Sequence, residues 1–297
     1  MKTILVPTDF SEHALYALKV AASIAKKTKS KIRLVHASAT PTISDGFQSF
    51  HYYDRFHREL KARTEEQITE LSQLDFLKGI EVERHLVSDS LLWEIKNCKW
   101  FKSADLIVVG SHGASGFSKG FIGSNTEKIV RLANSPVLTI KNEIDDFVIK
   151  EMVFASNFLE ESYTSFEKIK YFSDLYNVHF HLLKVITPKE FEPTPVSQKL
   201  IKDFVDKFGL ENYSVSVYNS TSIETGIIAF SNEVGADLVA IETHGRTGFA
   251  HLINGSLAED IVKHETKPVL SIKIKTPIEH GERFTGYRGG YSSWGHE

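Results

Sequence analysis

The stretch that decides the fold is "GSHGASGFSKGFIGSNTEKIV" at residues 110–130, because it occurs again as "ETHGRTGFAHLINGSLAEDIV" at residues 242–262. Each copy follows an apolar run and leads into a helical pattern. Aligning residues 104–141 with 236–273, without a gap, gives 17 identities in 38 positions. Chance identity is about 6% from average residue usage. We therefore expect two related halves.

The beginnings of the two halves also match. "KTILVPTDFSE" from Lys2 aligns with "KEMVFASNFLE" from Lys150. We expect a first domain at residues 1–142, a second at 143–275, and a Gly- and aromatic-rich tail at 276–297. The tail is interpreted either as a flexible terminus or as a short segment that docks on a partner or another subunit.

Within each half, short Val, Ile and Leu runs alternate with helical patterns, such as those at residues 11–28 and 55–77. Continuous apolar runs of this length are typical of strands buried on both faces of a parallel sheet. We predict an α/β fold of two tandem doubly wound domains, each a five-stranded parallel sheet flanked by helices. The predicted strands are 3–8, 31–37, 82–87, 104–110 and 136–141, then 151–156, 178–185, 213–219, 236–242 and 268–273.

Composition narrows the function classes. The formal net charge of −3 argues against a generic binder of nucleic acid or membrane surfaces, which needs a positive surplus. Cys98 is the only cysteine, which excludes an intramolecular disulfide and fits a reducing cytoplasm. The first residues lack the apolar stretch of a signal peptide, and no segment has the roughly 18 apolar residues of a membrane helix. We expect a cytoplasmic protein without nucleic-acid or membrane partners.

The repeated motif has the order strand, glycine loop, helix. Ligands of open α/β sheets bind beyond the carboxyl ends of the strands. Glycines let backbone N–H groups approach an anion, and the first turn of a helix offers unpaired donors at the positive end of its dipole. The hydroxyls of Ser124 and Thr126 would add donors, and Asp9 would accept hydrogen bonds from a ribose or a base. Ser124 and Glu127 also predict a capping box at the helix start.

A purely structural turn is the alternative, because glycines at strand–helix junctions are common for conformational reasons. The spacing matches neither a Walker loop nor a Rossmann fingerprint. Zinc binding by His36, His112 or His244 lacks any supporting ligand spacing. The residues alone therefore leave a phosphate site and a structural turn both open.

Gly110-x-x-Gly113, nine residues, then Gly123-Ser124 resembles the nucleotide-binding signature of the universal stress protein family, and "PTDFS" at residues 7–11 resembles its first-strand loop. The resemblance covers both halves. It implies ATP, with or without Mg²⁺, between the first and fourth strands. It also implies pairing along the last strand, in a homodimer or between the two domains. The residues assigned to the ATP site are Pro7, Thr8, Asp9, Ala37, Gly110, His112, Gly113, Gly123, Ser124, Asn125 and Thr126.

The second half departs from this signature. Asn157 replaces the aspartate, Glu242 replaces the opening glycine, and Leu257 and Ala258 follow the second Gly-Ser pair. A carboxylate near phosphates would repel them by a few kcal/mol at low dielectric. We predict that the first domain binds ATP and that the second binds it weakly or not at all.

The function that follows is a non-catalytic ATP-binding protein whose nucleotide alters its surface or assembly and so its contact with an unknown protein partner. A stress-response or regulatory role is implied by the resemblance alone. Two alternatives remain: a slow ATPase, and a nucleotide-free interaction module that uses the tail or the long connector of the first half.

Overall fold

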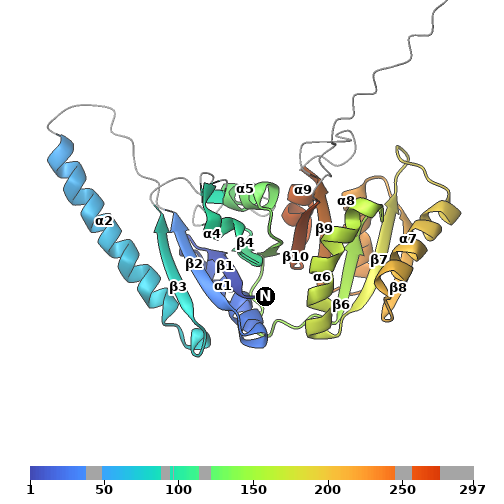
Figure 1. Ribbon diagram of the computed structural model, residues 1–297. Helices are drawn as coiled ribbons and strands as arrows, with labels where there is room; N and C mark the ends of the chain where they lie inside the picture. Colours follow the sequence, from blue (N-terminus) through green and yellow to red (C-terminus); the bar gives the residue numbers. More distant parts are fainter. Residues whose placement is uncertain (38–48, 88–93, 96, 114–121, 245–255, 275–297) are drawn as a thin grey trace, which may run out of the picture.

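Ten strands form one continuous sheet in this computed structural model (Figure 1). Their order is β3-β2-β1-β4-β5-β10-β9-β6-β7-β8. Within each half the strand pairs are parallel and the first strand is central, which is the doubly wound arrangement expected from the sequence. The structure describes residues 1–37, 49–87, 94–95, 97–113, 122–244 and 256–274.

All ten predicted strands are present, with ends that differ from prediction by at most two residues. The first half contains β1 (Thr3–Pro7), α1 (Glu12–Thr28), β2 (Lys31–Ala37), α2 (Ser49–Ser72), the 3₁₀ turn η1 (Asp75–Leu77), β3 (Val82–Val87), α4 (Lys99–Lys102), β4 (Leu106–Gly110), α5 (Ser124–Leu132) and β5 (Val137–Ile140). The second half contains β6 (Glu151–Ala155), the 3₁₀ turn η2 (Glu160–Ser162), α6 (Tyr163–Tyr176), β7 (His179–Ile186), α7 (Thr194–Phe208), β8 (Tyr213–Asn219), α8 (Ile223–Glu233), β9 (Leu238–His244), α9 (Ser256–His264) and β10 (Val269–Ile274).

Helices cover both faces of the sheet, so its strands are buried on both sides. Alternate side chains of β1 enter different core clusters: Ile4 and Val6 lie on one face, and Leu5 lies on the other. Helices α1, α2, α6 and α7 pack on the first face, and α4, α5, α8 and α9 pack on the second. This double burial explains the continuous apolar runs of the sequence.

Helix α1 is well specified locally. Ser11 caps its start by accepting a hydrogen bond from the N–H of Ala14, and Lys29 ends it in the left-handed conformation. Helix α2 differs from the prediction. It begins and ends earlier than the pattern at residues 55–77. Ile68 is buried, but Leu60 is 36% exposed, because the N-terminal part of α2 extends away from the sheet (Figure 1).

The two halves join where β5 runs antiparallel to β10, with Leu138 opposite Leu270. This is the pairing along the last strand that the family resemblance implies, and it occurs within one chain. The ammonium of Lys141 donates hydrogen bonds of 2.7 Å to the carbonyls of Lys263 and Glu265, at the end of α9. The predicted tail, residues 276–297, lies outside the described residues. In the described ranges no helix is both long and apolar enough to span a bilayer.

Candidate functional site

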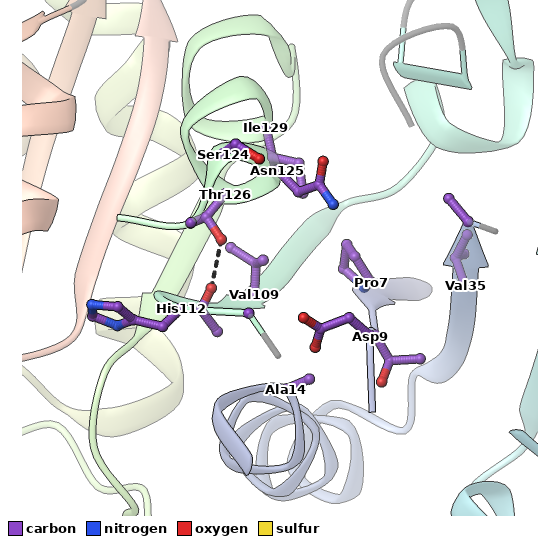
Figure 2. Close-up of a pocket in the computed structure, with 15 residues that line it drawn as sticks. Pro7, Asp9, Ala14, Val35, Val109, His112, Ser124, Asn125, Thr126 and Ile129 are labelled. Atoms are coloured by element: carbon purple, nitrogen blue, oxygen red, sulfur yellow. Dashed lines mark hydrogen bonds between the residues drawn. The ribbon is translucent and has the colours of Figure 1, made fainter. Parts of the chain in front are cut away.

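A cavity of about 230 Å³ lies at the carboxyl ends of β1 and β4, beside the start of α5. We call it the first-half cavity. Strand β1 lies between β2 and β4, so the connections diverge at this point, where open α/β sheets bind ligands. All eleven residues that the family resemblance assigned to the ATP site line this cavity, together with Ala14, Val35, Val109 and Ile129 (Figure 2).

The loop after β1 is fixed by its own side chains. The N–H of Phe10 donates to Thr8 Oγ1 at 3.0 Å, and the N–H of Ser11 donates to Asp9 Oδ1 at 3.1 Å. Phe10 has a φ of 63°, and its ring stacks on His36 with centroids 4.6 Å apart. These turn hydrogen bonds and the stacking hold the Asp9 carboxylate at the edge of the cavity.

The glycines serve different purposes. A Cβ on Gly110 would lie 2.6 Å from the backbone carbonyl of His13, so Gly110 permits the close approach of α1. A Cβ on Gly113 would lie 2.5 Å from Asp9 Oδ2, and one on Gly123 would lie 3.3 Å from the nitrogen of Gly113. Gly110 is therefore required by the packing of α1, whereas Gly113 leaves room at the cavity for the carboxylate of Asp9.

Helix α5 begins without a side-chain cap. Its N-cap is Gly123, and Ser124 is the first helical residue. The predicted capping box of Ser124 and Glu127 is therefore wrong. The N–H of Glu127 donates to the carbonyl of Gly123 at 2.9 Å, as the first hydrogen bond of the helix. The N–H groups before Glu127 thus have no partner from a capping side chain, and they lie beside the cavity at the positive end of the helix dipole.

Thr126 has a structural role that the sequence did not reveal. Its side chain is buried, and its Oγ1 donates a 2.7 Å hydrogen bond to the carbonyl of Gly110 (Figure 2). The single hydroxyl proton of Thr126 is thereby committed to the strand end, so the expected donation to a phosphate is not available in this geometry. Ser124 and Asn125 are exposed at the rim of the cavity.

The imidazole of His112 points away from Asp9 and Asn125 in Figure 2. Its Nδ1 is 2.7 Å from the hydroxyl of Ser111, and its ring centroid is 5.0 Å from that of His13. Burial lowers the pKa of His112 below its usual 6.5, and the neighbouring His13 and Lys141 lower it further. The ring is therefore uncharged near neutral pH and adds no positive charge to the cavity.

The second half has a cavity at the equivalent place, of about 500 Å³, which we call the second-half cavity. Its lining residues Ser156 and Asn157 occupy the positions of Thr8 and Asp9. Glu242 is only 7% exposed, and its Oε2 accepts a 2.6 Å hydrogen bond from Ser156. Sequence reasoning foresaw the carboxylate but missed both its partner and the size of the cavity.

Glu151, His179 and His181 form a separate cluster on β6 and β7, with ligand-type atoms within 4.8 Å of one another. Nε2 of His181 lies 2.9 Å from Glu151 Oε2, and Nδ1 of His179 lies 2.7 Å from Asn212 Oδ1. Both histidines fall in residues 178–185, for which the sequence predicts only a strand. The cluster lies on β6 and β7 and does not line either cavity.

Comparisons with known proteins match both halves of the chain to one family model and about half of the chain to individual relatives. The model of the universal stress protein family matches residues 1–141 and 149–273. A universal stress protein of Methanocaldococcus jannaschii is 27% identical over 141 residues, which cover 47% of this chain and 82% of that protein. Universal stress protein YxiE of Bacillus subtilis is 26% identical over 144 residues, which cover 46% of this chain and 97% of that protein.

Solved structures resemble both halves together. A universal stress protein from Archaeoglobus fulgidus has a TM-score of 0.71 and 20% identity, covering 92% of this chain and 96% of that one. A Pseudomonas aeruginosa protein described as a universal stress protein has a TM-score of 0.61 and 18% identity, covering 92% and 93%. At such identities the likeness supports the fold alone. Because the family model matches most of both halves, the chain belongs to the universal stress protein family and carries two of its domains in tandem.

Proposed function

We propose that the first-half cavity binds ATP and that the protein is a nucleotide-dependent stress-response or regulatory binding protein. The observation that carries the proposal is the joining of two features around one cavity. The Asp9 carboxylate is held on one side, and the uncapped start of α5 lies on the other. The nucleotide-binding signature shared with the family supports the same ligand.

The two sides of the cavity suit different parts of the nucleotide. Val35, Ala37 and Val109 offer an apolar wall for the adenine ring, and Asp9 accepts hydrogen bonds from the ribose or the base. The first-turn N–H groups of α5 and the hydroxyl of Ser124 face the phosphates. Mg²⁺ would enter with the triphosphate, because Asp9 is the only carboxylate among the described lining residues.

Binding is proposed rather than hydrolysis, because hydrolysis needs a placed base and an in-line water. Asp9 Oδ1 accepts a hydrogen bond from the N–H of Ser11, and the His112 ring points away from the cavity. A slow ATPase is the alternative, and it predicts steady phosphate release that disappears in a Gly123→Trp variant. Constant ATP over hours at 37 °C supports simple binding.

The bound nucleotide would contact both the loop after β1 and the start of α5, and it would thereby fix the position of one relative to the other. A partner protein would then read the relative position of these two elements. Pairing of β5 with β10 already uses the last strand of each half. A homodimer would therefore form through another surface.

The test compares two matched variants by calorimetric titration with ATP and Mg²⁺. Asp9 Oδ1 and Asn157 Oδ1 accept equivalent turn hydrogen bonds, each of 3.1 Å. Asp9→Ala should weaken ATP binding about tenfold, or roughly 1.4 kcal/mol, because a ribose or base contact is lost. Asn157→Ala should lose the same turn hydrogen bond and leave ATP binding unchanged.

Equal effects of the two substitutions would contradict binding in the first half. If the wild-type protein gives no heat of binding with ATP and contains no bound ATP after purification, the nucleotide-free interaction module becomes the better description. Thermal melts of both variants control for loss of folding.

A further inference from the structure

The second-half cavity is larger than the first-half cavity and differs in chemistry. It lies at the carboxyl ends of β6, β7 and β9, and its volume of about 500 Å³ is within the usual range for small-molecule sites. Ten of its seventeen lining residues are apolar, including Leu183, Ile223, Ile227 and Leu257. A cavity with this lining favours a ligand with a largely apolar body.

At the helix start that borders this cavity, two polar residues of the first half are replaced by apolar ones. Leu257 occupies the position of Asn125, and Ala258 occupies that of Thr126. Ala258 is buried, and Leu257 lines the cavity. Leu257 therefore places hydrocarbon beside the first turn of α9 where Asn125 presents a polar side chain on α5, and a phosphate would lose water there without gaining a hydrogen bond from this side chain.

Seven polar residues complete the lining of this cavity: Ser156, Asn157, Lys184, Lys189, Glu190, Glu192 and Glu242. The three carboxylates outnumber the two lysines, and Glu242 stands at the position of Gly110 in the first half. The Glu242 carboxylate is buried beside the end of β9, and Ser156 donates to its Oε2. A carboxylate in an apolar setting attracts hydrogen-bond donors and repels anions more strongly than it would in water. The ammonium of Lys184, which also lines the cavity, donates to Glu192 at 2.6 Å and is neutralised by that carboxylate.

We propose that the second-half cavity binds a small apolar molecule whose amine or hydroxyl group donates to Glu242, and that it excludes anionic ligands. Duplication of the domain has then produced two sites of different chemistry in one sheet. The inference is independent of ATP binding in the first half, because it uses none of the residues of the first-half cavity.

Two fluorescent probes of almost the same shape test this directly. N-phenyl-1-naphthylamine is apolar and has one N–H donor, and 8-anilinonaphthalene-1-sulfonate is the same skeleton with a sulfonate. Both emit more strongly in an apolar site. Titrations use the full chain with saturating ATP and Mg²⁺. We expect one saturable site for the uncharged amine and at least tenfold weaker binding of the sulfonate.

Three variants locate the site. Ile223→Trp should fill the cavity and weaken binding of the amine at least tenfold. Val196→Trp, on α7 and 48% exposed outside the cavity, should leave that binding unchanged. Glu242→Gln keeps a hydrogen-bond acceptor for Ser156 but removes the charge. It should therefore reduce the difference in affinity between the amine and the sulfonate to threefold or less. Circular dichroism melts identify any variant that fails to fold.

Three results would each overturn the proposal. One is amine binding that Ile223→Trp leaves intact in a folded variant. Another is displacement of the amine by ATP, which would move the probe to the first half. The third is a preference between the probes that does not change in Glu242→Gln, since the carboxylate would then have no part in selecting the ligand.

Discussion

Ser156 donates a 2.6 Å hydrogen bond to the carboxylate of Glu242, and these two residues occupy the positions of Thr8 and Gly110 in the first half. In the first half, α1 approaches Gly110 too closely to admit a Cβ. In the second, the residue equivalent to Glu12 is Glu160, which lies in the 3₁₀ turn η2, and α6 begins only at Tyr163. The later helix start leaves room for the glutamate.

Gly110 and Gly113, at the end of β4 and in the loop that follows it, should respond differently to replacement by alanine. In Gly110→Ala, the new Cβ would meet the backbone of His13 at 2.6 Å, which cannot yield without moving α1. We expect a loss of about 1–3 kcal/mol in the free energy of unfolding, typical of overpacking. In Gly113→Ala, the clash is with the side-chain carboxylate of Asp9 rather than with backbone, so the unfolding free energy should change little while ATP affinity falls.

Urea denaturation and ATP titration of both variants separate the two roles. If Gly110→Ala were as stable as wild type, close packing by α1 would not be the reason for this glycine. A Gly113→Ala variant with full ATP affinity would remove Asp9 from the proposed site.

Thr126 should stabilise the fold through its hydroxyl. Thr126→Val keeps the shape of the side chain but leaves the carbonyl of Gly110 without its donor. An unsatisfied buried acceptor costs about 1–3 kcal/mol. Thr126→Ser retains the hydroxyl and should recover part of that loss, as measured by urea denaturation. Equal stabilities of the valine and serine variants would show that the methyl group, rather than the hydrogen bond, matters.

Lys141 should hold the two halves together. It is half-buried, and its ammonium donates to two carbonyls at the end of α9. Burial lowers the pKa of Lys141, with Glu265 acting in the opposite direction. Lys141→Met should cost about 1.5–3 kcal/mol, the range for hydrogen bonds to charged groups, and separate the calorimetric unfolding of the halves into two transitions.

Lys170→Met is the matched control for that experiment. Lys170 lies on α6 and pairs with Asp174 one helical turn away at 3.8 Å, on the surface. Its removal should change the unfolding free energy by at most about 0.5 kcal/mol. A single cooperative transition in Lys141→Met, at the wild-type temperature, would contradict a role for this residue at the junction.

Glu83 should make stability fall in acid. A hydrogen bond from Lys31 lowers the pKa of Glu83 from 4.5 to about 2, with a further contribution from Arg33 and against the effect of burial. Arg33 Nη2 lies 2.8 Å from Glu83 Oε2. A carboxyl with a lowered pKa stabilises the fold above its unfolded pKa, and this stabilisation is lost as the pH falls from 4.5 to about 2.

Glu83→Gln removes that titration. We expect the variant to be less stable than wild type at neutral pH, by about 1 kcal/mol for a partly exposed pair. The difference should shrink as the pH falls below 4.5. Urea denaturation midpoints of both proteins, measured from neutral pH down to about pH 2, check this. A stability difference that stays constant across that range would exclude the ion pair as the cause of the difference.

The strands and the location of the cavity could be predicted from the sequence, but several side-chain roles could not. Apolar runs such as residues 106–110 predict strands because a strand buried on both faces is apolar at every position. The glycine spacing located the loops at the sheet edge. The partner of Thr126 lies sixteen residues away across the loop, and the packing of Gly110 depends on where α1 enters. Both depend on tertiary contacts that no local pattern encodes.

The site of the second half could be predicted only in part, because it too depends on tertiary contacts. Glu242 and Leu257 predict a second site that differs from the first, and the consequences that the sequence suggested, a charge near phosphates and a lost hydroxyl donor, concerned phosphate binding alone. The retained cavity depends on the later start of α6 and on the serine that holds Glu242. A polar residue replaced by leucine at a helix start was the available signal for an apolar site.

The nucleotide content of the purified protein tests the central claim most directly. Untagged protein is denatured, and the released nucleotide is identified and quantified per chain, with a Gly123→Trp variant processed in parallel. Binding in the first half alone predicts about one ATP per chain, lost in the variant. Two nucleotides per chain, or none even after incubation with ATP and Mg²⁺, would contradict it.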